Sequence, residues 1–547
     1  MKSTPCRHHL PIFFTAFLAA SLTAILPQAK GAETRPNILF IYSDDHAQKL
    51  IGAYDGSLNK TPNLDRIAHE GAIFNNSFVG NSICCPCRAT VLTGKHSHLN
   101  GVLGHEPSSR WNGTQWVYPR ELANAGYQTA LIGKWHMIPN PTNNEFQYWD
   151  VLSGYGGQGS YYNPDFIGSS GPSKVIGYSS DIITDKALDW LKQRDPSKPF
   201  LLCVQYKTPH IPRIPAVKDM NSHEGEKFAE PPTLFDDFAT RQPFVAQTLM
   251  AIKGMHDIGI GIAPTAEEAL AHPEKVPRDI ADMTPDQVAA WHKAYDPRNR
   301  EYEALKATGK IKGKEGVQYL YQRFISDYVR CVDNLDENAG RLLEYLDKTG
   351  LAKDTIVVYS SDQGFFAGEH GWAEKRFMYE EGFRTPLMIR WPGVIKPGTK
   401  IDALVQNIDM APTFLTAAGI KVPEEVQGKP LQPVLCGITP PDWRKDLLYT
   451  YYDGGIPGAP GDYNMPRHMG VRDDRYKLIH YYDYDAWEFY DLQSDPHELN
   501  NRYADPACAG EVARLKQRLS DLKEEYKVPE PAKLVPKKKQ GDDRESI

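Results

Sequence analysis

The sequence predicts an α/β fold: a large, mostly parallel sheet between helices, followed by a smaller C-terminal subdomain with an antiparallel sheet and a helix. Two observations predict it. Through the first 440 residues, four apolar runs alternate with helical stretches, which is typical of a buried parallel sheet. Beyond residue 440 the apolar runs become shorter and are separated by turn residues, which favours antiparallel strands.

Each predicted parallel strand is apolar without interruption, which indicates that helices cover both of its faces. Polar residues follow each strand at once. Because ligands of open α/β sheets bind outside the carboxyl ends of the strands, we expect these polar residues to share one crevice. Helices are expected between the strands, among them 62–70 and 319–348. The four strands are expected at residues 37–42, 128–133, 200–206 and 355–359.

The C-terminal subdomain is assigned to residues 441–528, after a main domain of residues 32–440. A helix with Leu515, Leu519 and Leu522 on one face is expected to close it. Its strands are expected at 447–452, 468–472, 476–481 and 487–492. Residues 218–318 are rich in charge and proline and carry no strong strand pattern, so we expect a helical insertion built of short pieces near the sheet edge. Residues 529–547 are rich in Pro and Lys and are predicted to be a disordered tail.

Residues 1–31 read as a secretory signal peptide. Lys2 and Arg7 precede an apolar run from Leu10 to about Leu26, and small residues suited to cleavage follow near residues 29–32. A retained membrane anchor is less favoured, because the run is short and contains Ser and Thr. We therefore expect an exported protein, periplasmic or secreted, with no transmembrane segment in the mature chain.

Composition narrows the range of partners. The chain has 547 residues, of which 41% are hydrophobic, so a full core can form. Its formal charge of -7 argues against nucleic acid as a general partner. A local basic pocket for an anion remains compatible with this charge.

Three cysteines lie within five residues, in the run Cys84-Cys85-Pro86-Cys87-Arg88. A structural zinc site usually needs a second Cys or His pair at a set distance, and the next cysteine is Cys203. A disulfide between such close neighbours seldom meets the required geometry. Pro86 suits the first turn of a helix, which would place residue 84 at a helix amino end, where free N–H groups favour an anion.

Two pairs of residues with oxygen-bearing side chains follow predicted strands. Asp44-Asp45 follow the first strand, and Asp362-Gln363 follow the last of the four. Carboxylate and amide oxygens are the ligands that hard cations such as Ca²⁺ prefer. The sequence therefore predicts one cation site from these residues, with Mg²⁺ open as an alternative.

Cys84-x-Pro86-x-Arg88 resembles the signature of the type I sulfatases. Thr93-Gly94-Lys95, Gly133-Lys134-Trp135-His136 and Asp362-Gln363-Gly364 follow in the order found in that family, and the resemblance runs from about Arg35 to the last helix. It implies an alkaline-phosphatase-like sandwich, with residues 32–440 as the catalytic domain of a sulfuric ester hydrolase. Cys87 is a departure, because the fourth motif position is usually Ser or Ala.

The resemblance also implies roles for single residues. Cys84 would be oxidised by a formylglycine-generating or sulfatase-maturating enzyme to formylglycine (3-oxoalanine), whose hydrated aldehyde attacks sulfur. One Ca²⁺ per chain would be bound by Asp44, Asp45, Asp362 and Gln363 with residue 84. Arg88 would support the modified residue and the metal, and His210 would bind sulfate and donate a proton to the leaving oxygen. Lys134 and His136 would hold the sulfate and the modified residue, and Lys375 would be the second lysine that binds the sulfate.

The expected substrate is a sulfated carbohydrate. The stretches 44–47, 81–84 and 333–338 look like those of bacterial N-acetylglucosamine-6-sulfatases, which favours removal of a 6-O-sulfate from N-acetylglucosamine. Arg467 and His468 are hypothesised to contact the sugar, with ordinary strand-edge polarity as the alternative. Other readings are a sulfatase of another glycan or an aryl sulfate, a phosphomonoester or phosphonate hydrolase of the same superfamily, and a non-catalytic binder of sulfated glycans.

Overall fold

The computed structural model describes residue 1 and residues 35–105, 110–255, 257–454 and 465–530. The predicted signal peptide and nearly all of the predicted disordered tail lie outside these residues. Among the described helices, none combines the length and the apolarity needed to cross a membrane.

A ten-stranded mixed sheet forms the centre of the main domain, in the order β11-β2-β10-β9-β1-β8-β4-β5-β6-β7. The four predicted strands are its middle, β9-β1-β8-β4, and each is parallel to its neighbour in this group. Residue Ile38 of β1 lies opposite Leu201 on one side and Ile356 on the other. The strands are β1 (Asn37–Ser43), β2 (Ala72–Phe74), β4 (Gln128–Gly133), β5 (Tyr148–Leu152), β6 (Asp165–Gly168), β7 (Gly171–Lys174), β8 (Phe200–Gln205), β9 (Thr355–Ser361), β10 (Leu387–Arg390) and β11 (Thr399–Ile401).

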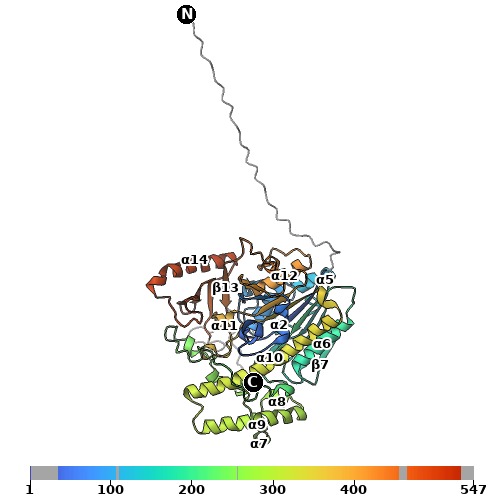
Figure 1. The fold of residues 1–547 in the computed structure, drawn as a ribbon, viewed down its shortest axis with the longest axis vertical. Coiled ribbons are helices and arrows are strands. Elements are labelled where there is room, and N and C mark those ends of the chain that lie inside the picture. Colours follow the sequence, from blue (N-terminus) through green and yellow to red (C-terminus); the bar gives the residue numbers. More distant parts are fainter. Residues whose placement is uncertain (2–34, 106–109, 256, 455–464, 531–547) are drawn as a thin grey trace, which may run out of the picture. The chain divides into compact units, whose positions relative to one another are not determined.

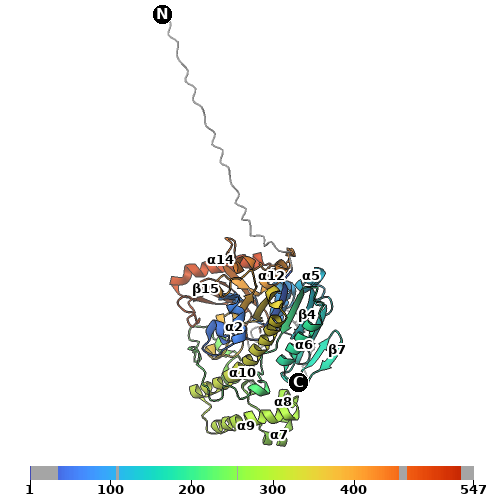
Figure 2. The same ribbon diagram turned by 45° about the vertical axis from the view of Figure 1, so that its right-hand side comes forward.

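Helices cover both faces of this sheet, as continuous apolarity requires. Successive side chains of a strand point to opposite faces, and β1 follows this rule: Phe40 packs with Phe414 and Leu122, whereas Ile41 packs with Ile183 and Leu335. The first face is covered by α3 (Cys84–Thr93), α5 (Tyr118–Asn124) and α12 (Met410–Ala417). The second face is covered by α2 (Pro62–His69), α6 (Ser179–Gln193) and α10 (Gly313–Lys348), which run beside one another in Figures 1 and 2.

The sheet extends beyond the predicted strands at both edges. The added strands are short, and several carry few apolar residues; β7 reads Gly-Pro-Ser-Lys and is half-buried to exposed. Such strands form because a neighbouring strand offers unpaired backbone N–H and C=O groups. Their side chains therefore need not follow the apolar pattern by which a strand is recognised in a sequence. A separate two-stranded sheet pairs β3 (Ser77–Phe78) with β12 (Val405–Gln406).

The C-terminal subdomain is the predicted antiparallel sheet with a helix. Its four strands pair in sequence order, β13-β14-β15-β16, and α14 (Ala509–Glu525) packs Leu515 and Leu519 against Leu448 and Val471. The other face of the sheet packs on the main domain through Tyr449 and its neighbours. The strands are β13 (Asp446–Tyr451), β14 (His468–Asp473), β15 (Tyr476–Tyr481) and β16 (Ala486–Asp491).

The described part of residues 218–318 holds no strand, and it contains one long helix that the sequence did not indicate. Helix α9 (Pro285–Ala307) spans 23 residues and starts with a capping box between Thr284 and Gln287. Pro297 lies inside it, and its buried residues are few, so its apolar periodicity is weak. Helix α10 begins at Gly313, six residues before the predicted start. The remaining helices are α1 (Gly52–Asp55), α4 (Ser97–Asn100), α7 (Ala266–Ala271), α8 (Arg278–Ala281), α11 (Glu380–Phe383) and α13 (Gln432–Leu435).

Candidate active site

The carboxyl ends of the two neighbouring strands β1 and β9 meet the amino end of α3. Asp44 and Asp45 follow β1, Asp362 follows β9, and Cys84 is the first residue of α3. Ligand atoms of these four residues all lie within 4.8 Å of one another, and all four side chains are fully buried. Asp45 adopts a φ of 63°, which is uncommon for a residue with a side chain; its backbone N–H donates to Oδ1 of Asp362 at 3.2 Å.

Gln363 completes this group as a candidate cation site. Its Nε2 donates to Oδ1 of Asp45, while its Oε1 is buried and has no hydrogen-bond partner among the described residues. The two ends of an amide are assigned from the hydrogen-bond network, and a rotation by half a turn would direct the oxygen into the group. Three carboxylates and one amide oxygen fit a hard divalent cation.

Arg88 lies one turn along α3 and neutralises part of this negative charge. Its Nη2 donates to Oδ2 of Asp362 at 2.9 Å, and its Nη1 donates to Oε1 of Gln205 at 2.6 Å. The guanidinium lies 5.3 Å from the ring centre of Tyr42. Contacts with the Tyr42 ring and with charged groups therefore both fix Arg88, one helical turn after Cys84.

Two lysines pair with the two aspartates after β1. Lys134, which follows β4, forms a fully buried ion pair with Asp44, and Lys375 lies 2.7 Å from Oδ2 of Asp45. Burial alone would lower the pKa of Lys375, but the carboxylate of Asp45 raises it, so Lys375 is protonated. Arg88, Lys134 and Lys375 lie within ion-pair distance of the three carboxylates, and burial lowers the pKa of Lys134 well below its usual value. A divalent cation added to this group would make it more positive and more favourable for an anionic ligand.

His210 borders the same group, and His136 lies in the loop after β4, beside Cys85 and His105. Nε2 of His210 lies 3.8 Å from Oδ2 of Asp45, and its Nδ1 lies 2.8 Å from the carbonyl oxygen of Ile211. The carbonyl can only accept, so Nδ1 carries the proton and Nε2 faces the site. Burial, followed by the charge of Lys134, lowers the pKa of both imidazoles well below the usual value.

Arg467 and His468, which were hypothesised to contact the sugar, make their contacts elsewhere. His468 is fully buried between the rings of Tyr449 and Tyr451, and its Nδ1 contacts the carbonyl oxygen of Pro466. Arg467 forms an ion pair with Asp483. A sugar would therefore reach the ring of His468 only after its aromatic neighbours moved.

The structure adds two residues that the sequence argument passed over. Gln205, the last residue of β8, holds Arg88, and Lys207 is a buried cation 5.4 Å from the ring centre of Tyr161. Burial lowers the pKa of Lys207 to about 8, although the carboxylates of Asp279 and Asp45 act in the opposite direction. Both residues lie at the carboxyl end of β8, so the expectation that polar residues at the strand ends share one crevice could have found them.

Two protein-family models match this chain. The model described as Sulfatase matches residues 36–420. The model described as N-sulphoglucosamine sulphohydrolase, C-terminal, matches residues 368–525. The two matches overlap at residues 368–420, which include Lys375.

Similar proteins also include sulfatases. An N-acetylglucosamine-6-O-sulfatase of Bacteroides thetaiotaomicron is 42% identical over 537 residues, covering 97% of this chain and 93% of the relative. A solved structure of a protein in complex with its substrate D-glucosamine-2-N,6-O-disulfate superposes with a TM-score of 0.86 at 42% identity, covering 91% of this chain and 99% of that chain. A multifunctional alkaline phosphatase superfamily protein of Trinickia caryophylli is 27% identical, covering 89% of this chain and 94% of that protein.

Proposed function

The chain belongs to the sulfatase family and is a sulfuric ester hydrolase, and we propose that its substrate is the 6-O-sulfate ester of N-acetylglucosamine. Sulfatases generally use formylglycine and a divalent metal. For this chain we propose that Cys84 is the formylglycine precursor and that the metal is Ca²⁺. The observation that carries the proposal is the meeting of Asp44, Asp45, Asp362 and Cys84 within 4.8 Å.

The four oxygen-bearing side chains Asp44, Asp45, Asp362 and Gln363 would hold the Ca²⁺. The buried oxygen of Gln363, which lacks a partner among the described residues, supports this assignment, because a buried polar atom is normally satisfied. Formylglycine would supply a hydrated aldehyde as the nucleophile towards sulfur, and a bound cation would lower the pKa of its hydroxyl and balance charge on the sulfuryl oxygens.

The protein's own cations would bind and orient the sulfate. Lys134 pairs with Asp44, and Lys375 pairs with Asp45. With a divalent cation bound to these carboxylates, the two ammonium groups would be available to pair with a bound sulfate. Arg88 would keep Asp362 in place. His136 would hold residue 84 and the sulfate from the loop after β4.

His210 would donate a proton to the leaving oxygen. Its Nε2 faces the site without a proton in the structure as it stands, because burial and Lys134 favour the neutral imidazole. An anionic sulfate beside Nε2 would raise the pKa of the imidazole and favour its protonation. The proton would then be positioned for the departing sugar oxygen, as general acid catalysis requires.

The similarity to the N-acetylglucosamine-6-O-sulfatase and to the protein bound to a glucosamine disulfate supports the proposed substrate. The contact of Arg467 and His468 with the sugar stays a prediction. A His468→Ala variant with full activity on N-acetylglucosamine 6-sulfate would refute the contact.

We also propose that the protein is exported after cleavage near residues 29–32 and matured by a formylglycine-generating or sulfatase-maturating enzyme. Mass spectrometry of the peptide that contains residue 84 tests the maturation. The expected result in active enzyme is formylglycine at this position, and unmodified Cys84 in fully active enzyme would overturn the mechanism.

A panel of position-defined sulfated sugars tests the substrate. We expect the highest kcat/KM for N-acetylglucosamine 6-sulfate and much lower values for the 3-sulfate isomer. Phosphate and sulfate esters of one leaving group should be compared in the same assay. A preference for the phosphate ester would favour the phosphomonoesterase alternative, which the similarity to the multifunctional superfamily protein keeps relevant.

A further inference from the structure

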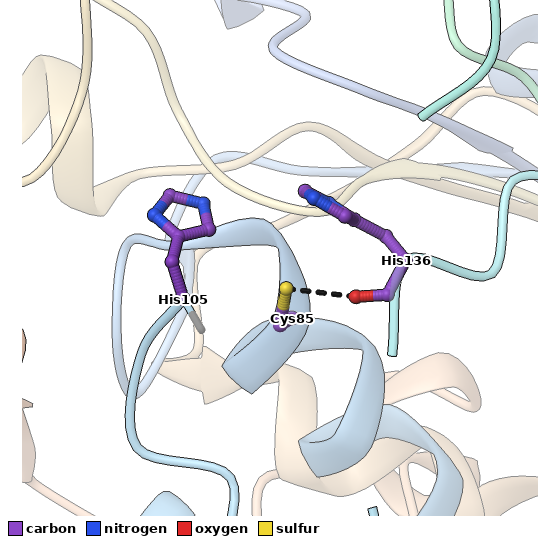
Figure 3. A group of neighbouring side chains, drawn as sticks. All are labelled: Cys85, His105 and His136. Carbon is purple, nitrogen blue, oxygen red and sulfur yellow. Dashed lines mark hydrogen bonds between the residues drawn. The ribbon is translucent and has the colours of Figure 1, made fainter. Parts of the chain in front are cut away.

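Cys85 points away from the aspartate group and towards two histidines. Its sulfur and one ring nitrogen of each of His105 and His136 all lie within 4.8 Å of one another. Figure 3 shows the sulfur directed to the space between the two imidazole rings, whose centres are 5.7 Å apart. The three residues come from separate segments: the first turn of α3, the loop after α4, and the loop after β4.

An unpartnered ring nitrogen indicates that this group can accept a ligand. Nδ1 of His136 is buried and has no hydrogen-bond partner within the described part of the chain, and His136 as a whole is only 7% exposed. A buried ring nitrogen of this kind usually has a partner. The thiol of Cys85, which donates to the carbonyl oxygen of His136 at 2.8 Å, does not supply one.

Asp453 supports His105 from behind. Its Oδ2 accepts the backbone N–H of His105 at 2.9 Å and lies 3.4 Å from Nδ1 of the ring. A carboxylate on one ring nitrogen orients a histidine so that the other nitrogen can bind a metal. Gly104 permits this approach, because a Cβ at that position would lie 2.4 Å from Cγ of Asp453.

The donor set selects the kind of cation. One thiolate and two imidazoles suit Zn²⁺ and similar transition metals, whereas Ca²⁺ prefers oxygen. We propose that Cys85, His105 and His136 form a second cation site, selective for Zn²⁺, directly beside the active site. Three protein ligands leave the fourth tetrahedral position to water. On binding, the S–H bond of Cys85 breaks, a sulfur–zinc bond forms, and the proton is released to solvent.

Binding at this site would lower turnover, a consequence that rests on the proposed function of His136. The imidazole would be held by zinc and withdrawn from residue 84. The carbonyl of His136 would also lose the thiol hydrogen bond of Cys85. Zinc would therefore inhibit the enzyme without displacing Ca²⁺ from the aspartate group.

Cobalt titration tests the site without reference to activity. Co²⁺ bound to a thiolate gives a charge-transfer band in the near ultraviolet, and we expect this band when Co²⁺ is added to the full-length mature protein in excess Ca²⁺. Cys85→Ser should abolish it, and Asp453→Asn should weaken Co²⁺ binding about 10- to 100-fold. Cys84→Ser and Cys436→Ser, which alter the active-site cysteine and an exposed free cysteine, should keep it.

The outcomes separate this proposal from the proposed function. No band in wild type, or a band that persists in Cys85→Ser, would overturn the zinc site whatever the activity. A band in Cys84→Ser together with no sulfatase activity would support the site. Inhibition by Zn²⁺ is then measured relative to each variant's own activity without zinc; His105→Ala should raise the inhibitory concentration at least about tenfold, and an unchanged value would refute the inhibitory role.

Discussion

Two consecutive residues at the start of α3 face two different sets of donor atoms. Cys84 joins Asp44, Asp45 and Asp362, whereas Cys85 joins His105 and His136. Consecutive residues of a helix point about 100° apart, so one turn can serve two sites. The first set is built of oxygen donors at strand ends, and the second is built of sulfur and nitrogen donors, two of them on loops.

The comparison shows how the supporting element determines the character of a site. The aspartates are fixed by neighbouring parallel strands and by three buried cations, so their positions depend on the sheet. His105 depends on a loop and on Asp453. We therefore expect the oxygen site to be essential and rigid, and the sulfur and nitrogen site to be adjustable.

Replacing Cys84 by Ala should have the largest effect. Without a nucleophile precursor, sulfatase activity should fall by roughly 10⁴-fold or more. The measurement is kcat/KM on N-acetylglucosamine 6-sulfate, with circular dichroism to check that the variant folds. Activity within tenfold of wild type would show that residue 84 is not the nucleophile and would remove the functional contrast between Cys84 and Cys85.

Removing one carboxylate should weaken binding of the cation at the oxygen site. Asp362→Asn takes a negative charge from the oxygen site and weakens the ion pair with Arg88, so Ca²⁺ affinity should fall about tenfold or more. Calorimetric titration of chelator-treated protein measures this. The matched control, Asp521→Asn on the exposed face of α14, should bind Ca²⁺ as wild type does.

The same chelator-treated protein tests which cation restores activity. Added Ca²⁺ should restore activity, and added Zn²⁺ should not. If Zn²⁺ alone restored full activity, the two donor sets would not discriminate between hard and soft cations, and the division drawn between them would fail.

His210→Ala tests the residue that lies beside the oxygen site without binding the cation. Loss of a general acid typically lowers the rate by about 10²- to 10⁴-fold, and the loss should depend on the leaving group. A sugar alcohol needs a proton, whereas 4-nitrophenol leaves as an anion, so activity on 4-nitrophenyl sulfate should fall much less. Equal losses on both substrates would assign His210 to sulfate binding alone.

The sheet and the oxygen site were accessible from the sequence because both follow from local patterns. Continuous apolar runs predicted β1, β4, β8 and β9, and the residues after them met because these strands are adjacent and parallel. Edge strands such as β7 and the long helix α9 were missed, because their side chains carry little apolar periodicity. Pro86 was predicted to lie in the first turn of a helix with residue 84 at its amino end, and α3 begins at Cys84.

The second donor set was not accessible in the same way. His105 lies in a loop with no motif around it, and nothing in the sequence indicates that it meets Cys85 and His136. Zinc was set aside at Cys84-Cys85-Pro86-Cys87 because no second pair follows at a standard spacing, yet the fold supplies histidines from distant segments. His468 was hypothesised to contact the sugar, and its ring is buried among aromatic residues from other elements, which the sequence around it does not show.

Cys87→Ser should have the smallest effect, and it tests whether the third cysteine belongs to either set. The thiol of Cys87 is buried and donates to the carbonyl oxygen of Asn81 at 2.8 Å, a bond that a serine hydroxyl can replace. We expect the free energy of unfolding to change by about 1 kcal/mol or less, with Ca²⁺ affinity, the cobalt band and kcat/KM unchanged once formylglycine content is normalised. A lost cobalt band would extend the sulfur and nitrogen site to Cys87, and a lost Ca²⁺ affinity would couple it to the oxygen site. Unchanged values would show that Cys87 belongs to neither site. Of the three cysteines in the first turn of α3, only Cys84 and Cys85 would then contribute to cation binding.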